Sequence, residues 1–319
     1  MRPANSSRLP AAGGFLAIAR ALPLLALIAV PNVGAQPSTV TFSTEVNLVV
    51  LNATVRNRKG EYVSGLEKAD FQVFENGVPQ AIGIFREQDA PVAVGLVVDN
   101  STSMARKRHD VTAAALAFVR ASNPQDQMFI VNFNERVSFG LPPTKLFSAR
   151  TAELEAALNG APARGRTALY DAVEAGLARL REATIERKAL IVISDGGDNA
   201  SRHARAQVLD DAARGGATIY AVGLFDIDDE DRDPGFLKAL AHATGGQAFL
   251  PRETTDVVPI CERIAAALRQ QYTLGYAPSS PPVECDYRRI QVQANGRHGE
   301  KYAVSTRAGY LVCPSGKLR

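Results

Sequence analysis

The stretch GLVVDNSTSMARKRHD, residues 95–110, changes character abruptly. An apolar run over residues 92–98 ends in Asp99, and Ser101 and Ser103 follow at a spacing of two. Three small side chains that carry oxygen therefore share one short loop. Such a loop can hold a metal ion, begin a helix or activate a nucleophile. The rest of the sequence has to distinguish these three roles.

From residue 91 onward, short apolar runs alternate with amphipathic stretches that often end in Gly, as helix C-termini do. This alternation is typical of a mostly parallel sheet that is covered by helices on both faces. We therefore expect an α/β fold with a doubly wound, Rossmann-like sheet. The expected strands are 92–98, 128–133, 190–194, 218–224 and 248–250, and the expected helices are 109–122, 168–183, 204–216, 233–246 and 256–271.

Two β-rich stretches flank this region. Residues 40–55 alternate like a strand, and DFQVFENGVPQAIGIF (70–85) contains the hairpin signal Glu75-Asn76-Gly77. Beyond residue 271, the segments YTLGYAP, RRIQVQA, KYAVSTR and GYLV are again β-like. We expect an N-terminal β-rich module at 36–90, an α/β domain at 91–271 and a C-terminal β-rich segment at 272–319. The sequence leaves open whether the two β segments form one split domain.

The first 35 residues have the pattern of an export signal. Three arginines and no acidic residue accompany the apolar run ALPLLALIAV, and VGA at 33–35 is a typical cleavage site. The alternative is an uncleaved N-terminal anchor. Removing this segment leaves 33 basic and 33 acidic residues, and this balance gives no electrostatic case for nucleic-acid binding. We expect a periplasmic or secreted protein with no membrane-spanning helix after cleavage.

The three cysteines do not have the spacing of metal ligands. Export permits a disulfide, and Cys285 and Cys313 flank the β-rich tail, so this pair is the favoured one. Cys261 is then expected to be buried on a helix. The sequence alone does not settle the connectivity.

Two further polar positions occupy equivalent places in the pattern. Asp195 ends a second buried run in ALIVISDGGDN, and Thr167 precedes a helix in GRTALYDA. If the strands before Asp99 and Asp195 are neighbours, the two carboxylates converge, because ligand sites lie beyond the carboxyl ends of parallel strands. At about 6 Å their repulsion is about 3 kcal/mol, which a cation would offset. Two carboxylates and three hydroxyls favour Mg²⁺, Mn²⁺ or Ca²⁺ over Zn²⁺ or Cu²⁺.

These pieces resemble the metal-ion-dependent adhesion site of a von Willebrand factor A domain. That site has the pattern Asp-x-Ser-x-Ser, then a Thr, then an Asp, and DNSTS, Thr167 and Asp195 match it in order over about residues 91–271. The flanks DFQVFENGVPQAI, YTLGYAP and RAGY (307–310) resemble the related bacterial proteins common in acidobacteria.

The resemblance implies a set of roles. Ser101, Ser103 and Thr167 would ligate the cation, Mg²⁺ by preference, through their hydroxyls. Asp99 and Asp195 would act mostly through bound water. An open position on the cation would then accept a carboxylate from a partner protein.

Plainer alternatives exist for single residues. Ser103 and Thr167 could each cap a helix, although capping does not explain the whole set. We expect Asp198 to be solvated and residues 106–109 to form an exposed helix face. DIDDEDRD (226–233) lacks the glycine and the last glutamate of an EF-hand, so we expect a solvated acidic loop.

Three classes of function follow. The favoured one is an exported, non-enzymatic, metal-dependent protein-binding module without a small-molecule cofactor. A structural subunit of an envelope assembly with an unused site is the second. A Mg²⁺-dependent hydrolase is the third; no Walker loop, Gly-x-Ser-x-Gly elbow or Gly-x-Gly-x-x-Gly motif supports it. The partner's identity is not encoded in any of these motifs.

Overall fold

The computed structural model describes residues 48–87, 89–225, 232–296 and 299–314. The predicted export signal, the residues 40–47 of the first expected strand and most of the acidic loop at 226–233 lie outside these ranges. Within the described residues, no helix has the length and apolar character needed to cross a membrane.

The middle of the chain forms a six-stranded sheet in the order β10-β9-β8-β5-β6-β7. All neighbouring strands are parallel except β7, which pairs antiparallel with β6. The central strands are mostly apolar, and nearly all of their residues are buried, as expected for a sheet covered on both faces. The strands are β5 (Ala93–Asp99), β6 (Gln127–Phe133), β7 (Val137–Phe139), β8 (Lys188–Ser194), β9 (Thr218–Gly223) and β10 (Ala248–Phe249).

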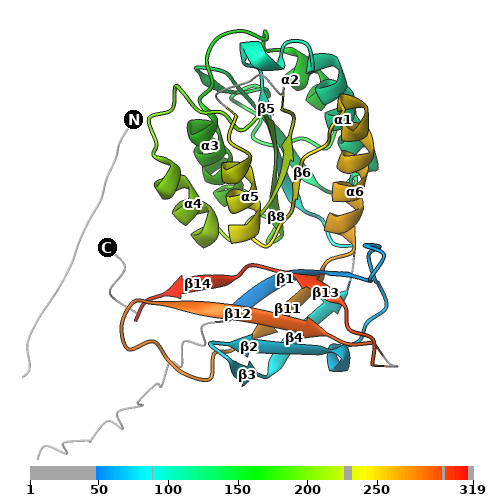
Figure 1. The fold of residues 1–319 in the computed structure, drawn as a ribbon, viewed down its shortest axis with the longest axis vertical. Coiled ribbons are helices and arrows are strands. Elements are labelled where there is room, and N and C mark those ends of the chain that lie inside the picture. The colour runs from blue at the N-terminus through cyan, green and yellow to red at the C-terminus, as the bar shows by residue number, and fades with distance from the viewer. Residues whose placement is uncertain (1–47, 88, 226–231, 297–298, 315–319) are drawn as a thin grey trace, which may run out of the picture. The chain divides into compact units, whose positions relative to one another are not determined.

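Helices cover both faces of this sheet. Figure 1 shows α3, α4 and α5 on one side and α1 and α6 on the other, and α2 packs beside α1. Each predicted strand and helix is found within a few residues of its expected bounds, which confirms the predicted fold class. The helices are α1 (Arg108–Ala121), α2 (Thr151–Asn159), α3 (Leu169–Arg181), α4 (Arg205–Arg214), α5 (Pro234–Ala243) and α6 (Val257–Arg269).

The two β-rich flanks pair with each other. One sheet has the order β13-β1-β11-β4 and the other β14-β12-β2-β3, so each sheet contains strands from both ends of the chain. Side chains of both sheets share one buried core, with Leu51, Val73, Leu274 and Ile290 among them. The strands are β1 (Val49–Arg56), β2 (Phe71–Glu75), β3 (Val78–Gln80), β4 (Ile82–Glu87), β11 (Tyr272–Tyr276), β12 (Asp286–Ala294), β13 (Ala303–Ser305) and β14 (Gly309–Val312).

Two local predictions in this β region are confirmed. The hairpin between β2 and β3 turns at Asn76 and Gly77, whose φ angles are 49° and 82°. Cys285 and Cys313 form a disulfide, and Cys261 is a free, buried residue on α6. The disulfide joins the segment before β12 to the segment after β14, so it holds the last strand of the sheet in place.

A buried ion pair connects the two flanks. Arg288 on β12 donates to Glu75 on β2 at 2.6 Å, and both side chains are less than a tenth exposed. The other oxygen of Glu75 accepts hydrogen bonds from Tyr276 at 2.6 Å and Tyr310 at 2.8 Å. Residues far apart in sequence thus converge on one carboxylate in the core.

We predict that Glu75→Gln lowers the free energy of unfolding by about 3 kcal/mol, because it leaves the buried Arg288 without a counter-charge. Urea unfolding followed by circular dichroism measures this. The exposed Glu155→Gln on α2 is the matched control and should change stability by less than about 0.5 kcal/mol. Equal stability of the two variants would mean that the ion pair does not hold the flanks together.

Candidate metal centre

The candidate site lies where the strand order of the six-stranded sheet reverses. From β5 the chain continues outward on one side through β6, and from β8 it continues outward on the other side through β9. β5 and β8 are direct parallel neighbours, with Val98 opposite Ile193. Their carboxyl ends therefore meet at the edge where doubly wound sheets bind ligands. Asp99 is the last residue of β5, and Asp195 follows the last residue of β8.

Asp99 is held by hydrogen bonds at both carboxylate oxygens. Its Oδ1 accepts from the backbone N–H of Ser101 at 2.8 Å, and its Oδ2 accepts from the hydroxyl of Ser194 at 2.6 Å. The Ser194 hydroxyl also accepts the N–H of Gly196 at 3.0 Å. Asp99 is only 3% exposed. The carboxylate is thus fixed in a buried position by the two neighbouring strands.

Ser101 and Ser103 connect Asp99 to the second aspartate, Asp195, through hydrogen bonds. The hydroxyls of Ser101 and Ser103 are 3.0 Å apart, and Ser103 donates to Asp195 Oδ2 at 2.5 Å. Asp195 is 2% exposed, whereas Ser103 is exposed. Four of the five predicted residues therefore form one connected cluster that reaches the surface at Ser103.

Thr167, the fifth predicted residue, lies on the loop that approaches this cluster. Thr102 contacts that loop because its N–H and its hydroxyl both donate to the carbonyl of Gly165, at 3.2 and 3.1 Å. Thr167 is 6% exposed, and its own N–H donates to Asn199 Oδ1 at 3.0 Å. The structure places Thr167 on the adjoining loop, and the ligand role of its hydroxyl stays a prediction.

Helix capping does not account for these hydroxyls. The N-cap of α1 is Lys107 rather than Ser103, which lies within a 3-10 helix, Thr102–Met104. The N-cap of α3 is Ala168 rather than Thr167. The hydroxyls of Ser103 and Thr167, for which the sequence allowed helix capping, therefore do not cap these helices.

The expected exposed helix face at residues 106–109 is wrong in part. Arg106 and His109 are exposed, but Lys107 is buried and its Nζ donates to the carbonyl of Leu224 at 2.7 Å. Arg108 is half-buried and donates to the side chain of Asn100. The helix begins only at Arg108, so Lys107, which precedes it, turns inward and braces the loop against the residue that follows β9.

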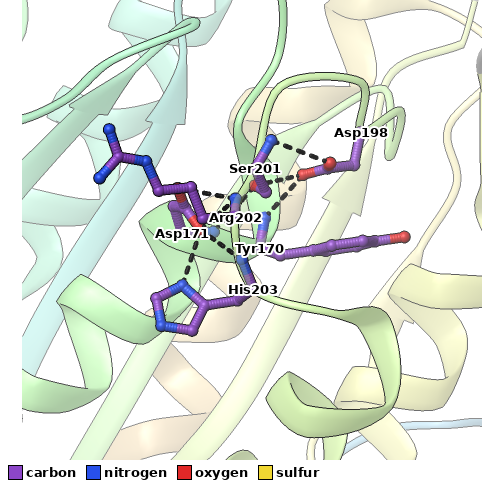
Figure 2. A network of polar contacts seen from close by, with 6 residues as sticks. All are labelled: Tyr170, Asp171, Asp198, Ser201, Arg202 and His203. Atoms are coloured by element: carbon purple, nitrogen blue, oxygen red, sulfur yellow. Dashed lines mark hydrogen bonds and ion pairs between the residues drawn. The ribbon is translucent and has the colours of Figure 1, made fainter.

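The expectation that Asp198 is solvated is also wrong. Its Oδ2 accepts from the N–H of Tyr170 at 3.0 Å and from the hydroxyl of Ser201 at 2.5 Å (Figure 2). The Ser201 hydroxyl in turn accepts the N–H of Asp171 at 3.0 Å. The loop after Asp195 therefore satisfies the free N–H groups at the start of α3, which need partners from outside the helix.

Asp171 binds the far end of the same loop. Its carboxylate accepts from the backbone N–H groups of Arg202 and His203, at 3.0 Å each, and lies 2.7 Å from Nδ1 of His203 (Figure 2). Burial raises the pKa of Asp171, but the hydrogen bonds from His203 and Arg202 outweigh it and leave the pKa below the ordinary value. The loop that carries Asp195 is thus anchored on α3 at two points.

The electrostatics of the cluster favour a cation. Burial, and then the nearby Asp195, raise the pKa of Asp99 to about 7 against the hydrogen bonds that lower it. No Lys or Arg of the described residues forms an ion pair with Asp99. The donors are hydroxyl and carboxylate oxygens, which suit Mg²⁺, Mn²⁺ or Ca²⁺.

The described residues contain no group of three or more His, Cys, Asp or Glu that could hold a metal. A site at Asp99 would therefore depend on hydroxyl oxygens as much as on carboxylates.

Sequence reasoning missed three residues that position the site. Ser194 fixes Asp99, and Asp171 and Asp198 anchor the loop after Asp195. Only Ser194 had a usable signal, because it is a polar residue at the end of an otherwise apolar run.

Of the acidic loop at 226–233, which we expect to be solvated, the structure describes only the end. There Asp233 caps α5 by accepting the N–H of Phe236 at 2.8 Å.

We predict that Mg²⁺ at about 100 times its dissociation constant raises the melting temperature of the EDTA-treated wild type by roughly 5 °C, and that Asp99→Asn abolishes the rise. At pH 8, above the pKa of Asp99, the wild type without cation holds a buried charge. Asp99→Asn removes that charge, so the cation-free variant should melt at the same temperature or higher.

Asp198→Asn is the control for this melt. It weakens the start of α3 but leaves the predicted ligands in place, so it should keep the response to Mg²⁺. An equal Mg²⁺ response in Asp99→Asn and the wild type would contradict a cation at Asp99.

Comparison with known proteins agrees with the fold of the α/β region. Residues 94–197 match the family model described as von Willebrand factor type A domain, and no curated protein matches the chain. Among solved structures, von Willebrand factor type A from Catenulispora acidiphila is 16% identical with a TM-score of 0.51, covering 76% of this chain and 74% of that one.

Two further structures have lower TM-scores. The vWF domain of the type V pili tip protein Mfa5 from Porphyromonas gingivalis is 14% identical with a TM-score of 0.47, covering 56% of this chain and 95% of that one. Proximal thread matrix protein 1 from the mussel byssus, with a zinc occupied MIDAS motif, is 15% identical with a TM-score of 0.47. The match covers 61% of this chain and 49% of that one.

The family match and the Catenulispora structure together show that the α/β region of the chain has the von Willebrand factor type A fold, with additional β segments on either side.

Proposed function

We propose that this protein is an exported, non-enzymatic binding module that captures a carboxylate of a partner protein through a divalent cation. The observation that carries the proposal is the cluster of Asp99, Ser101, Ser103 and Asp195 at the switch point of the sheet, with Thr167 on the adjoining loop. The von Willebrand factor type A fold is often used for metal-dependent adhesion, which is consistent with this reading.

The residues of the cluster fit a hard cation. Ser101, Ser103 and Thr167 would offer neutral hydroxyl oxygens, and Asp99 and Asp195 would supply negative charge from buried positions. Few direct anionic ligands leave a bound cation electron-poor, so it would supply a position that attracts an external carboxylate. We favour Mg²⁺, with Mn²⁺ and Ca²⁺ as alternatives, because all three prefer oxygen donors.

The surroundings of the cluster support binding rather than catalysis. The oxygens of Asp99 are occupied by Ser101 and Ser194, and Asp198 is engaged in capping α3. Glu135, on the neighbouring loop, accepts the N–H of Arg166 at 3.1 Å. These acids already have hydrogen-bonding roles within the protein, which favours binding over general-base catalysis.

Export is part of the proposal. It is supported by the signal-like residues 1–35 and by the disulfide Cys285–Cys313, since disulfides persist in oxidising compartments. The flanking stretches support placing the chain among the bacterial von Willebrand factor A-related proteins common in acidobacteria. Periplasm and cell exterior are both compatible with these features.

Binding of labelled, C-terminally amidated peptides such as GSGEGSG, followed by fluorescence anisotropy, tests this function. We predict saturable binding in Mg²⁺ that EDTA reverses and that falls about tenfold or more with GSGQGSG, which lacks the carboxylate. Asp99→Asn should lose the binding, whereas Asp210→Asn, an exposed aspartate on α4, should keep it. Binding that is equal in EDTA, or equal for both peptides, would contradict the proposal.

A further inference from the structure

We infer that the partner segment carries at least two carboxylates, one for the cation and another for a pair of arginines, Arg164 and Arg166, beside the site. This inference rests on the proposed function, because it adds a second contact to the same partner. It narrows the partner to an acidic stretch of polypeptide.

The backbone around these arginines is fixed against the metal loop. The N–H of Arg164 donates to the carbonyl of Asn100 at 2.9 Å, and the carbonyl of Gly165 accepts both donors of Thr102. Asn100 and Thr102 are the two residues that alternate with Asp99, Ser101 and Ser103 in the loop. The two arginines therefore stand on either side of Gly165, whose carbonyl binds Thr102 of the metal loop.

The turn between the arginines favours glycine, because its φ is one that other residues rarely adopt. Gly165 has a φ of +87°, and a Cβ at this position would lie 1.5 Å from Oε2 of Glu135. The same carboxylate accepts the N–H of Arg166 at 3.1 Å. The β6–β7 loop thus supports the arginine loop through one glutamate, which binds the backbone of Arg166.

The basic and acidic side chains around the site differ in whether they have partners within the protein. Arg164 and Arg166 are exposed, and within the described ranges neither side chain has an ion pair or a hydrogen bond. The acids of the same sheet edge are engaged: Glu135 binds backbone N–H, Asp198 caps α3, and Asp233 caps α5 and lies 3.5 Å from Arg205. Two guanidinium groups in the described part of the chain are therefore available for a ligand on this side of the cluster. The acidic stretch 226–231 lies outside the described residues.

The chemistry of arginine favours a second carboxylate. A guanidinium binds a carboxylate through two parallel hydrogen bonds, and it does not lose its charge. The cation would bind one carboxylate of the partner segment. The two arginines beside it would then bind a second carboxylate of the same segment. Two arginines are a short basic patch, which suits one further acidic side chain better than a long sulfated polysaccharide.

C-terminally amidated peptides with one and two glutamates test the inference in the full chain. In Mg²⁺, GSGEGEG should bind about fivefold more tightly than GSGEGSG, which is the gain expected from one or two exposed charge pairs. The gain should decrease when the salt concentration is raised to 0.5 M, because exposed charges are screened. The double variant Arg164→Gln/Arg166→Gln should lose the gain and keep the affinity for GSGEGSG.

The matched control is Arg120→Gln/Arg181→Gln. It removes two exposed arginines at the C-terminal ends of α1 and α3. It should keep the full gain. Equal affinity for the two peptides, or a gain that survives in Arg164→Gln/Arg166→Gln, would overturn the inference while leaving metal-dependent capture intact. Heparin that binds equally well in EDTA and displaces GSGEGEG would overturn it in favour of a polysaccharide. Absence of Mg²⁺-dependent binding for every peptide would overturn the proposed function itself.

Discussion

Two buried carboxylates at the junction of β5 and β8 are the constraint on which the site depends. Asp99 and Asp195 are almost completely buried, and burial together with Asp195 raises the pKa of Asp99 to about 7. Hydrogen bonds from Ser194 and Ser101 hold Asp99, but they do not supply a compensating charge. A sheet that brings two like charges together at its switch point is stabilised by a ligand of opposite charge.

The loops around the carboxylates are arranged so that this pair stays rigid. The loop after Asp195 is tied to α3 through Asp198 and Asp171, and the loop before α3 is tied to the loop after Asp99 through Gly165. Three segments far apart in sequence therefore share one set of hydrogen bonds. Such an arrangement restrains the loop that carries Ser101 and Ser103, and this would lower the entropic cost of the proposed binding.

Much of the fold could be predicted because its signals are local. Buried strands such as β8 are continuous apolar runs, and the hairpin at Asn76-Gly77 has its own turn signal. The approach of Asp99 to Asp195 could be predicted as well, because the carboxyl ends of parallel neighbours meet. The pairing of the two β flanks could not be derived, since nothing local in β2 indicates that β12, more than 200 residues later, is its neighbour.

Within the site, the sequence identifies candidate ligands, whereas the residues that support them leave no comparable signal. The spacing of Asp99, Ser101 and Ser103 is visible in one loop, whereas the role of Asp171 depends on a loop that returns to α3 about 30 residues later. The prediction for Lys107 is wrong for the same reason, because its partner is the carbonyl of Leu224, directly after β9. Side chains that stabilise a site through tertiary contacts leave no periodic signal in the sequence.

The most direct measurement is the position of Mn²⁺ in crystals of the protein, determined from its anomalous scattering. The account predicts one strong peak within about 2.5 Å of the hydroxyl oxygens of Ser101 and Ser103, close to Asp99 and Asp195, which disappears in Asp99→Asn crystals. The absence of a peak at this cluster in the wild type, or a peak elsewhere alone, would contradict the claim that these residues form a metal centre.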